Sequence, residues 1–155
     1  MAEWSIPFDV LAAKAKRSIE ETVRLSTMEM FGRVLFRSPV DTGRFRANWN
    51  ASYGAMDTTV SEETADPRAK VHNAILSFPV GGIVYLANSL PYAMTLEYGL
   101  YPNPAKYGSK KRGERRATIH TAGGYSMQAP HGMVRLTAAE FANAVDILVK
   151  TGKAT

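Results

Sequence analysis

Hydrophobic residues near the N-terminus recur at helical spacing. Residues 5–37 place most of their apolar side chains on one stripe, formed by Phe8, Leu11, Ala12, Ala15, Ile19, Val23, Met30, Phe31 and Val34. Ser5 can cap this helix, and Pro7 falls in its first turn, where proline is tolerated. Such a helix would be roughly 45 Å long, which exceeds the roughly 30 Å of a small domain. The pattern therefore predicts one long helix that bends, with Gly32 as its weakest point, or that overhangs onto a neighbour.

In residues 38–53 the helical spacing ends. Turn-forming residues come first, and an alternation of apolar and polar side chains follows. The residue before a proline is pushed out of the helical region, so Ser38-Pro39 should end the helix. Asp41-Thr42-Gly43 predicts a tight turn, because short polar side chains bond nearby backbone and glycine tolerates positive φ. Side chains then alternate, with the apolar set Phe45, Ala47, Trp49, Ala51 and Tyr53 opposite the polar set Arg44, Arg46, Asn48, Asn50 and Ser52. This alternation predicts a strand with one buried face and one wet, basic face.

The middle of the chain predicts two further strands. Residues 54–69 are polar and acidic, which favours a flexible connection with at most a short strand at 58–60. Residues 70–78 show moderate alternation and are interpreted as a strand. A turn at 79–82 contains one proline and two glycines, and the apolar run 83–87 after it predicts a strand buried on both faces.

The C-terminal third predicts two helices separated by a long connection. Pro91 opens a short helix over residues 92–98, and Gly99 suits the position just after its end. Residues 100–130 lack periodicity over a length that is usually functional or flexible. The final helix is expected from about residue 133 to 150, with a buried stripe of Val134, Ala138, Phe141, Val145 and Leu148. Residues 151–155 should form a frayed tail.

This order of elements predicts a single α+β domain over residues 1–150. A small, mainly antiparallel sheet would carry the first and last helices on one face. The 155 residues are 45% hydrophobic and 21% charged, which is enough apolar material for a real core. We expect no transmembrane helix and no signal peptide, because no apolar run of the required length is found. The absence of cysteine excludes disulfides and thiolate metal sites, and it suits synthesis in the cytoplasm.

The positive charge is concentrated in one segment. Residues 106–116 contain one acidic residue, Glu114, and six basic ones: Lys106, Lys110, Lys111, Arg112, Arg115 and Arg116. This segment alone therefore accounts for the net charge of +5, and the rest of the chain is neutral. It is either a solvated loop or a contact for an anionic partner, which would be DNA phosphate or an acidic protein surface. Tyr101, Tyr107 and Tyr125 flank it and could stack on bases or anchor the loop.

The sequence predicts no enzyme, no metal site and no cofactor, and it leaves a small enzyme of unrecognised type only as a third, weaker option. The three histidines, His72, His120 and His131, lack metal-ligand spacing and no carboxylate cluster joins them. No phosphate-binding loop, dinucleotide fingerprint or nucleophile elbow is present.

Four polar or aromatic residues have specific expected roles. Glu97 falls in the last turn of the short helix, where a carboxylate opposes the helix dipole, so we expect Arg44 or Arg46 within salt-bridge distance. Asn88 follows a strand and is interpreted as a turn former. Tyr92 and Tyr98 are expected to pack in the core or at its rim.

Three blocks of the sequence resemble one known protein family. Residues 39–49 read PVDTGRFRANW and are similar to a PVDTGxLRxSW signature. Residues 84–99 read VYLANSLPYAMTLEYG and resemble the pattern YxxNxxxYAxxxExG, and residues 129–135, APHGMVR, resemble its lead into a final helix. Phe45 stands where leucine is usual, and Asn48 where serine is usual. The family is that of the tail-completion, or head–tail joining, neck proteins of long-tailed bacteriophages.

The resemblance implies which residues define the scaffold. Carried over position by position, the motif residues are Pro39, Asp41, Thr42, Gly43, Arg44, Arg46, Trp49, Asn88, Tyr92, Glu97 and Gly99.

The resemblance also implies a function. The chain would be a non-catalytic structural protein of the virion, made in the host cytoplasm, that completes the tail so that a filled head can dock. It would act as a ring, a hexamer that matches the tail tube. Its partners would be other copies of itself, other neck proteins, the tail tube or tail terminator, and the head connector, with nonspecific contact to DNA in the lumen and none to membrane. The alternative is a nonspecific nucleic-acid-binding module that acts through residues 106–116.

Overall fold

The computed structural model describes residues 8–79, 81–102 and 120–151, and shows an α+β fold, as predicted. The long helix α1 (Phe8–Arg37) is followed by a single helical turn, α2 (Arg44–Ala47), and by strand β1 (Asn50–Tyr53). Helix α3 (Arg68–Ser77), strand β2 (Val84–Ala87) and the short helix α4 (Ala93–Tyr98) come next, and α5 (Val134–Thr151) is last. The two strands pair antiparallel, with Asn50 opposite Ala87 and Tyr53 opposite Val84.

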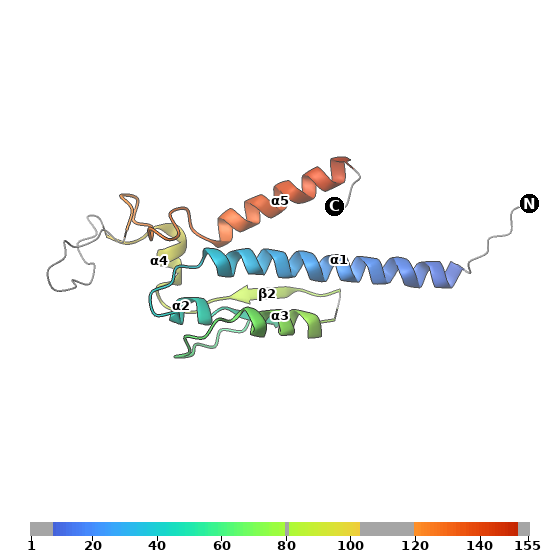
Figure 1. The fold of residues 1–155 in the computed structure, drawn as a ribbon, viewed down its shortest axis with the longest axis horizontal. Helices are drawn as coiled ribbons and strands as arrows, with labels where there is room; N and C mark the ends of the chain where they lie inside the picture. Colours follow the sequence, from blue (N-terminus) through green and yellow to red (C-terminus); the bar gives the residue numbers. More distant parts are fainter. Residues whose placement is uncertain (1–7, 80, 103–119, 152–155) are drawn as a thin grey trace, which may run out of the picture.

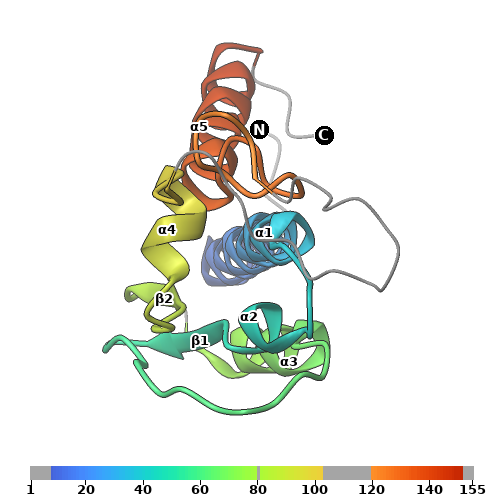
Figure 2. The same ribbon diagram turned by 90° about the vertical axis from the view of Figure 1, so that its left-hand side faces the viewer.

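The elements form layers around α1 (Figures 1 and 2). Helix α5 lies on one side of α1, and the sheet lies on the other side together with α2 and α3. Helix α4 connects the sheet layer to the α5 layer. The first and last helices lie on the same side of the sheet, as predicted, but α5 packs on α1, and α1 separates it from the sheet. The core where the layers meet consists of Phe31, Val34, Leu35, Phe45, Trp49, Val71, Ile75, Leu90, Leu96, Ala129 and Met133.

Helix α1 confirms the prediction of one long helix, and its first half overhangs the rest of the molecule (Figure 1). The helix continues through Gly32. Among the stripe residues whose side chains the structure describes, Phe31 and Val34 are buried, at 5% and 3% exposed, whereas Ile19 is 62% and Val23 is 46% exposed. The proposed cap and first turn before Phe8 lie outside the described residues.

The predicted strand over residues 44–53 is wrong in its first half. Gly43 adopts a left-handed φ of 93°, and the backbone then closes one helical turn in which the Ala47 amide donates to the Gly43 carbonyl. Phe45, Ala47 and Trp49 are buried as expected. Helical spacing also brings apolar side chains inward here, so alternation alone could not distinguish the two structures.

The predicted strand over residues 70–78 is also wrong, because these residues belong to helix α3. Val71 and Ile75, four residues apart, form its buried face. The Asp66 carboxylate accepts the Arg68 amide at 2.9 Å and so satisfies a donor at the helix start. The segment 54–67 contains no strand at 58–60, and β2 is half-buried instead of buried on both faces.

Both C-terminal helices are present, but the inward face of α5 differs from the prediction. Helix α4 ends at Gly99 with a left-handed φ of 67°, as expected. In α5 the predicted positions Val134 and Phe141 are 41% and 37% exposed, while Thr137 is buried. Thr137 follows the core residue Met133 by four positions, so both face inward, and the Arg37 guanidinium of α1 donates to the buried Thr137 hydroxyl at 2.8 Å. Val145 and Leu148 lie outside the described side chains. No helix within the described ranges is long and apolar enough to cross a membrane.

Candidate functional site

The three sequence blocks that carry the resemblance meet at one end of the molecule. We call this region the motif junction and define it as residues 38–49, 88–101 and 120–135. It contains α2, α4, the loop before α5 and the start of α5, at the left of Figure 1. Residues from all three segments line one cavity of about 430 Å³ there.

Glu97 is the buried centre of the motif junction. Only 8% of the residue is exposed, and one carboxylate oxygen accepts the Met133 and Val134 amides at 2.8 and 2.9 Å. The other accepts the Arg135 amide at 2.9 Å and the Arg135 Nε at 3.3 Å. The first amides of a helix have no partner within it, and a negative charge is favoured there. Glu97 therefore caps α5 and fixes the end of α4 to its start.

The expected ion pair between Glu97 and Arg44 or Arg46 is wrong. Arg44 pairs instead with Glu62. Arg46 donates to the Ser38 carbonyl at 2.8 Å, just after the last turn of α1. The physical reason is that the dipole of a second helix satisfies Glu97, so no cationic side chain from α2 is required.

The sequence analysis assigned no role to Arg135, although this residue lies in the third block. Its Nη2 donates to the Glu97 carbonyl at 2.7 Å and to the Tyr125 hydroxyl at 3.2 Å. Its guanidinium carbon lies 4.5 Å from the centre of the Tyr98 ring, a cation–π distance. The signal that could have found it is a basic residue at the start of a helix, where the dipole disfavours it unless a carboxylate lies close by.

Trp49 joins the motif junction to the end of α1. Its indole Nε1 donates to the Ser38 hydroxyl at 2.8 Å, and that hydroxyl donates to the Val34 carbonyl at 2.8 Å. The Phe45 and Trp49 rings meet edge to face with centroids 6.0 Å apart. Trp49 and Ser38 are both buried, so this relay satisfies polar atoms inside the core.

Two asparagines tie separate segments to α2. Asn48 is 2% exposed; its side chain donates to the Ser61 carbonyl at 3.0 Å and accepts the Ser61 amide at 2.7 Å. The sequence pattern predicted that Asn48 lies on the solvent-exposed face. This is wrong, because its side-chain amide forms hydrogen bonds with the backbone of Ser61. Asn88 accepts the Leu90 amide at 3.2 Å, as a turn former does, and also donates to the Phe45 carbonyl at 2.8 Å.

The turn at residues 39–43 forms one wall of the junction cavity. Gln128 exchanges two hydrogen bonds of 2.8 Å with the backbone of Val40, which joins the turn to the loop before α5. The cavity lining includes Pro39, Asp41, Thr42 and Gly43 from this turn. Tyr92 also lines the cavity, and its ring contacts that of Phe45.

The basic segment is attached at this cavity. The rings of Tyr101 and His120 stack with centroids 3.7 Å apart, and both residues line the cavity. The Tyr101 amide donates to the Gly124 carbonyl at 3.1 Å, and burial raises the pKa of the Tyr101 hydroxyl. The chain thus leaves the described region after Pro102 and re-enters it at His120, beside the residue from which it left. The six basic residues Lys106, Lys110, Lys111, Arg112, Arg115 and Arg116, and Tyr107, lie outside the described residues.

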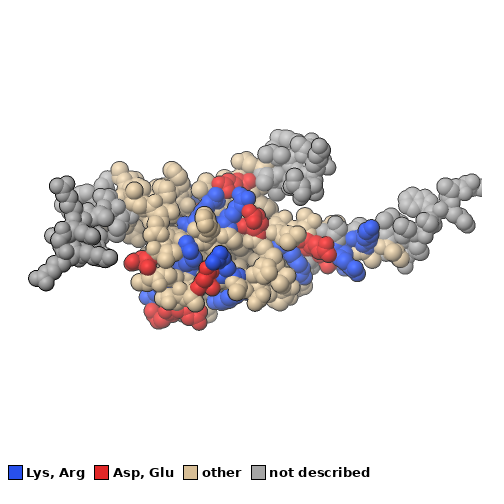
Figure 3. Space-filling model, viewed as in Figure 1, with Lys and Arg blue, Asp and Glu red and all other residues tan. Residues whose placement is uncertain are grey.

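Metal ligands are not clustered in the part of the chain that the structure describes, since no three His, Asp or Glu side chains within it lie close enough to hold a metal ion. On the face shown in Figure 3, basic and acidic side chains are mixed over most of the described surface, and acidic side chains gather at its lower left edge.

The comparisons with known proteins add no relative. The chain matches no protein-family model, none of the curated proteins and no solved structure.

Proposed function

We propose that this chain is a structural protein of a phage virion that acts at the head–tail junction as a ring and enables the head to join the tail. One observation carries this proposal. The three sequence blocks that resemble the neck family are up to about 90 residues apart in the sequence, yet they meet in a single hydrogen-bonded junction. If the three sequence matches had arisen by chance, their residues would not be expected to form hydrogen bonds with one another.

The chemistry of the junction supports a scaffold and not a catalyst. Glu97, Trp49 and Asn48 are buried and use their polar atoms on backbone or core groups. A catalytic site needs polar groups that converge on a substrate, and these groups converge on the protein itself. We therefore propose a non-catalytic role in which the junction holds its loops in place for contact with other proteins.

The charge of residues 106–116 supports contact with neighbouring components. The described residues on either side of this basic segment, Tyr101 and His120, stack on each other at the junction cavity. A charged segment that orders on binding a partner pays its conformational entropy at that step, which keeps early assembly steps reversible.

Localisation in purified virions tests this proposal. Antibodies to the protein, detected with gold particles by electron microscopy, should label the neck between head and tail. Label on the head surface or the tail fibres, or no protein in purified particles, would contradict the proposal.

Measuring DNA binding at increasing salt concentration distinguishes the proposed function from the alternative. A nonspecific nucleic-acid-binding module should bind duplex DNA with submicromolar affinity and a steep loss of affinity with salt, whereas the structural role predicts no binding at physiological salt.

A further inference from the structure

One edge of the sheet has no strand beside it. Strands β1 and β2 pair antiparallel, and among the described residues the sheet contains no third strand. The Gly54 amide donates to the Ile83 carbonyl at 2.9 Å and continues this ladder by one pair. Hydrogen-bonded pairs in an antiparallel ladder recur at every second residue, so Tyr85 directs its backbone groups toward β1. Val84 and Leu86 therefore direct theirs away from β1.

The outward-facing backbone groups of β2 are unpaired. Within the part of the chain that the structure describes, the outward amides and carbonyls of Val84 and Leu86 form no hydrogen bond. Such a row of free donors and acceptors is a template for a further strand. Natural edge strands are commonly protected by lysine, proline or a bulge. Strand β2 reads Val-Tyr-Leu-Ala and pairs in continuous register, so it has none of these protections.

The chain covers the opposite edge of the sheet with its own residues. The Asn50 side chain donates to the Thr59 carbonyl at 2.9 Å, and the Ser52 hydroxyl accepts the Asp57 amide at 3.1 Å. The segment 57–61 is thereby held beside β1. The fold thus provides a cover for the edge formed by β1.

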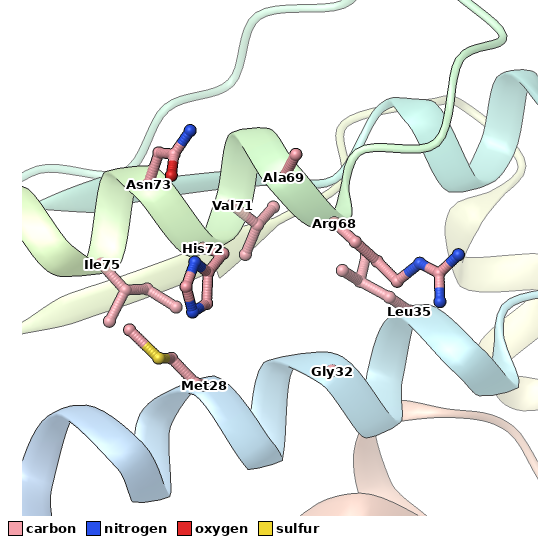
Figure 4. Close-up of a pocket in the computed structure, with 9 residues that line it drawn as sticks. All are labelled: Met28, Gly32, Leu35, Arg68, Ala69, Val71, His72, Asn73 and Ile75. Atoms are coloured by element: carbon pink, nitrogen blue, oxygen red, sulfur yellow. The ribbon is translucent and has the colours of Figure 1, made fainter.

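Helix α3 also encloses the sheet on the side of β1. It contacts both β1 and α1. Its Val71 and Ile75 point toward α1 (Figure 4) and pack in the core with Leu35. At β2, by contrast, the adjoining Ile83 is 63% exposed, and Val84 is only half-buried. The edge formed by β2 is therefore the one at which a further strand can be added.

We propose that β2 pairs antiparallel with β2 of a second copy of this chain, about a two-fold axis. The register identifies the partner. When Tyr85 lies opposite its own copy, Val84 of each chain lies opposite Leu86 of the other. Both residues then form hydrogen-bonded pairs, so the outward amides and carbonyls of both strands are satisfied reciprocally.

The side chains fit this register. Val84 and Leu86 pack on the core, so Tyr85 lies on the other face of β2. Pairs without hydrogen bonds are the closest in an antiparallel ladder, so the two Tyr85 rings meet across the axis. Ile83 is diagonal to Tyr85 of the second copy, which covers its exposed side chain. Because β2 has no charged residue, pairing with its own copy brings no like charges together.

Disulfide trapping tests the register, because the chain has no cysteine of its own. In Tyr85→Cys the two Cα atoms at the axis would lie about 4.5 Å apart, within the limit of about 7 Å for a disulfide. The matched control Ser52→Cys lies opposite Tyr85 on β1. Its two copies would be three strand spacings, or about 14 Å, apart. Mild oxidation should join Tyr85→Cys into covalent dimers at least tenfold faster than Ser52→Cys. Equal rates would overturn the proposal.

Hydrogen exchange in the native chain tests the edge itself. The amides of Val84 and Leu86 should exchange at least tenfold more slowly at high protein concentration than at low. The Tyr85 amide already faces β1 and should change much less. Tyr85→Lys places like charges opposite each other, so it should remove this concentration dependence and give a monomer by analytical ultracentrifugation, with an unchanged circular dichroism spectrum. Tyr85→Phe should preserve the dimer.

Three results would overturn this pairing. The first is fast exchange of both amides at every concentration. The second is protection already present in the monomer, which would mean that the chain covers this edge itself. The third is protection that appears only on mixing with a different protein, which would assign the edge to that protein. A two-fold contact closes after two copies, so a ring would use other surfaces. Neck labelling can therefore fail while this pairing holds, and the reverse is equally possible.

Discussion

Glu97 at the end of α4 and Arg135 in the first turn of α5 are joined by three hydrogen bonds. Arg135 donates to the Glu97 carboxylate from its backbone amide and its Nε, and to the Glu97 carbonyl from its Nη2. Two further backbone amides, those of Met133 and Val134, share the carboxylate. The pair explains why a carboxylate is found at the unfavourable end of one helix: it lies at the favourable end of another.

We predict that Glu97→Ala lowers the free energy of unfolding by about 3 kcal/mol, because it leaves buried amides without an acceptor. Glu97→Gln should cost less, since one oxygen remains. The control Arg135→Ala should cost less than about 1 kcal/mol, because this side chain is 48% exposed. Urea unfolding monitored by fluorescence gives the three values. If Arg135→Ala proved as costly as Glu97→Ala, the ion pair and not the amide cap would be the main contribution.

Asn48 should hold the connection between β1 and α3 in place. Its side chain pairs with both backbone groups of Ser61. We expect Asn48→Ala to lower the free energy of unfolding by about 1–3 kcal/mol. The Ser61 amide should also exchange with solvent faster than in the native chain. Hydrogen exchange measures this directly, with the exposed Asn143→Ala as control. Unchanged exchange at Ser61 would show that other contacts hold the segment.

The contact between α1 and α5 should weaken in acid. A hydrogen bond from Arg37, with further contributions from Arg33, holds the pKa of the Glu140 carboxyl below its ordinary value. A lowered pKa means that the folded state favours the charged form, so this stabilisation is fully present above the ordinary glutamate pKa of about 4.3. It is lost as pH falls below that value and through the lower pKa of the folded state. Glu140→Gln should therefore reduce the decrease in Tm between pH 6 and pH 3. An identical pH profile in the variant would remove Glu140 as a source of acid sensitivity.

The basic segment should be required for assembly and not for folding. Lys110, Lys111 and Arg112 changed together to Glu should abolish head–tail joining, while circular dichroism remains unchanged. Exchange of lysine for arginine and arginine for lysine at the same positions keeps the charge and should preserve joining. Normal infectious particles from the charge-reversed variant would exclude an essential role for the segment, whether its partner is protein or DNA.

The long helix α1, the glycine-terminated helix α4 and strand β2 were predictable from sequence, whereas the helices α2 and α3 were not. The extent of α1 followed from a stripe over many turns, and the end of α4 from Gly99, because these signals are local. The single turn α2 and the helix α3 were interpreted as strands, since four to ten residues hold too few periods to separate helix from strand. The exposed Ile19 and Val23 could not be foreseen either: periodicity shows that a face is apolar but not what covers it.

The motif residues were identified from sequence, but their partners were not. Glu97 was recognised as a residue that needs a positive partner, yet that partner is the start of a helix 36 residues later, which only the tertiary fold brings close. Asn48 was placed on the solvent side because an asparagine that pairs with backbone looks the same in sequence as an exposed one.

Complementation of a defective lysate tests the central claim most directly. Cells infected with a phage whose copy of this gene carries an early stop codon should yield filled heads and separate tails. Purified native protein added to that lysate should restore joined particles in electron micrographs and raise the infectious titre by several orders of magnitude. If the mutant lysate already contains joined, infectious particles, or if the added protein leaves heads and tails apart, the protein does not act at the head–tail junction.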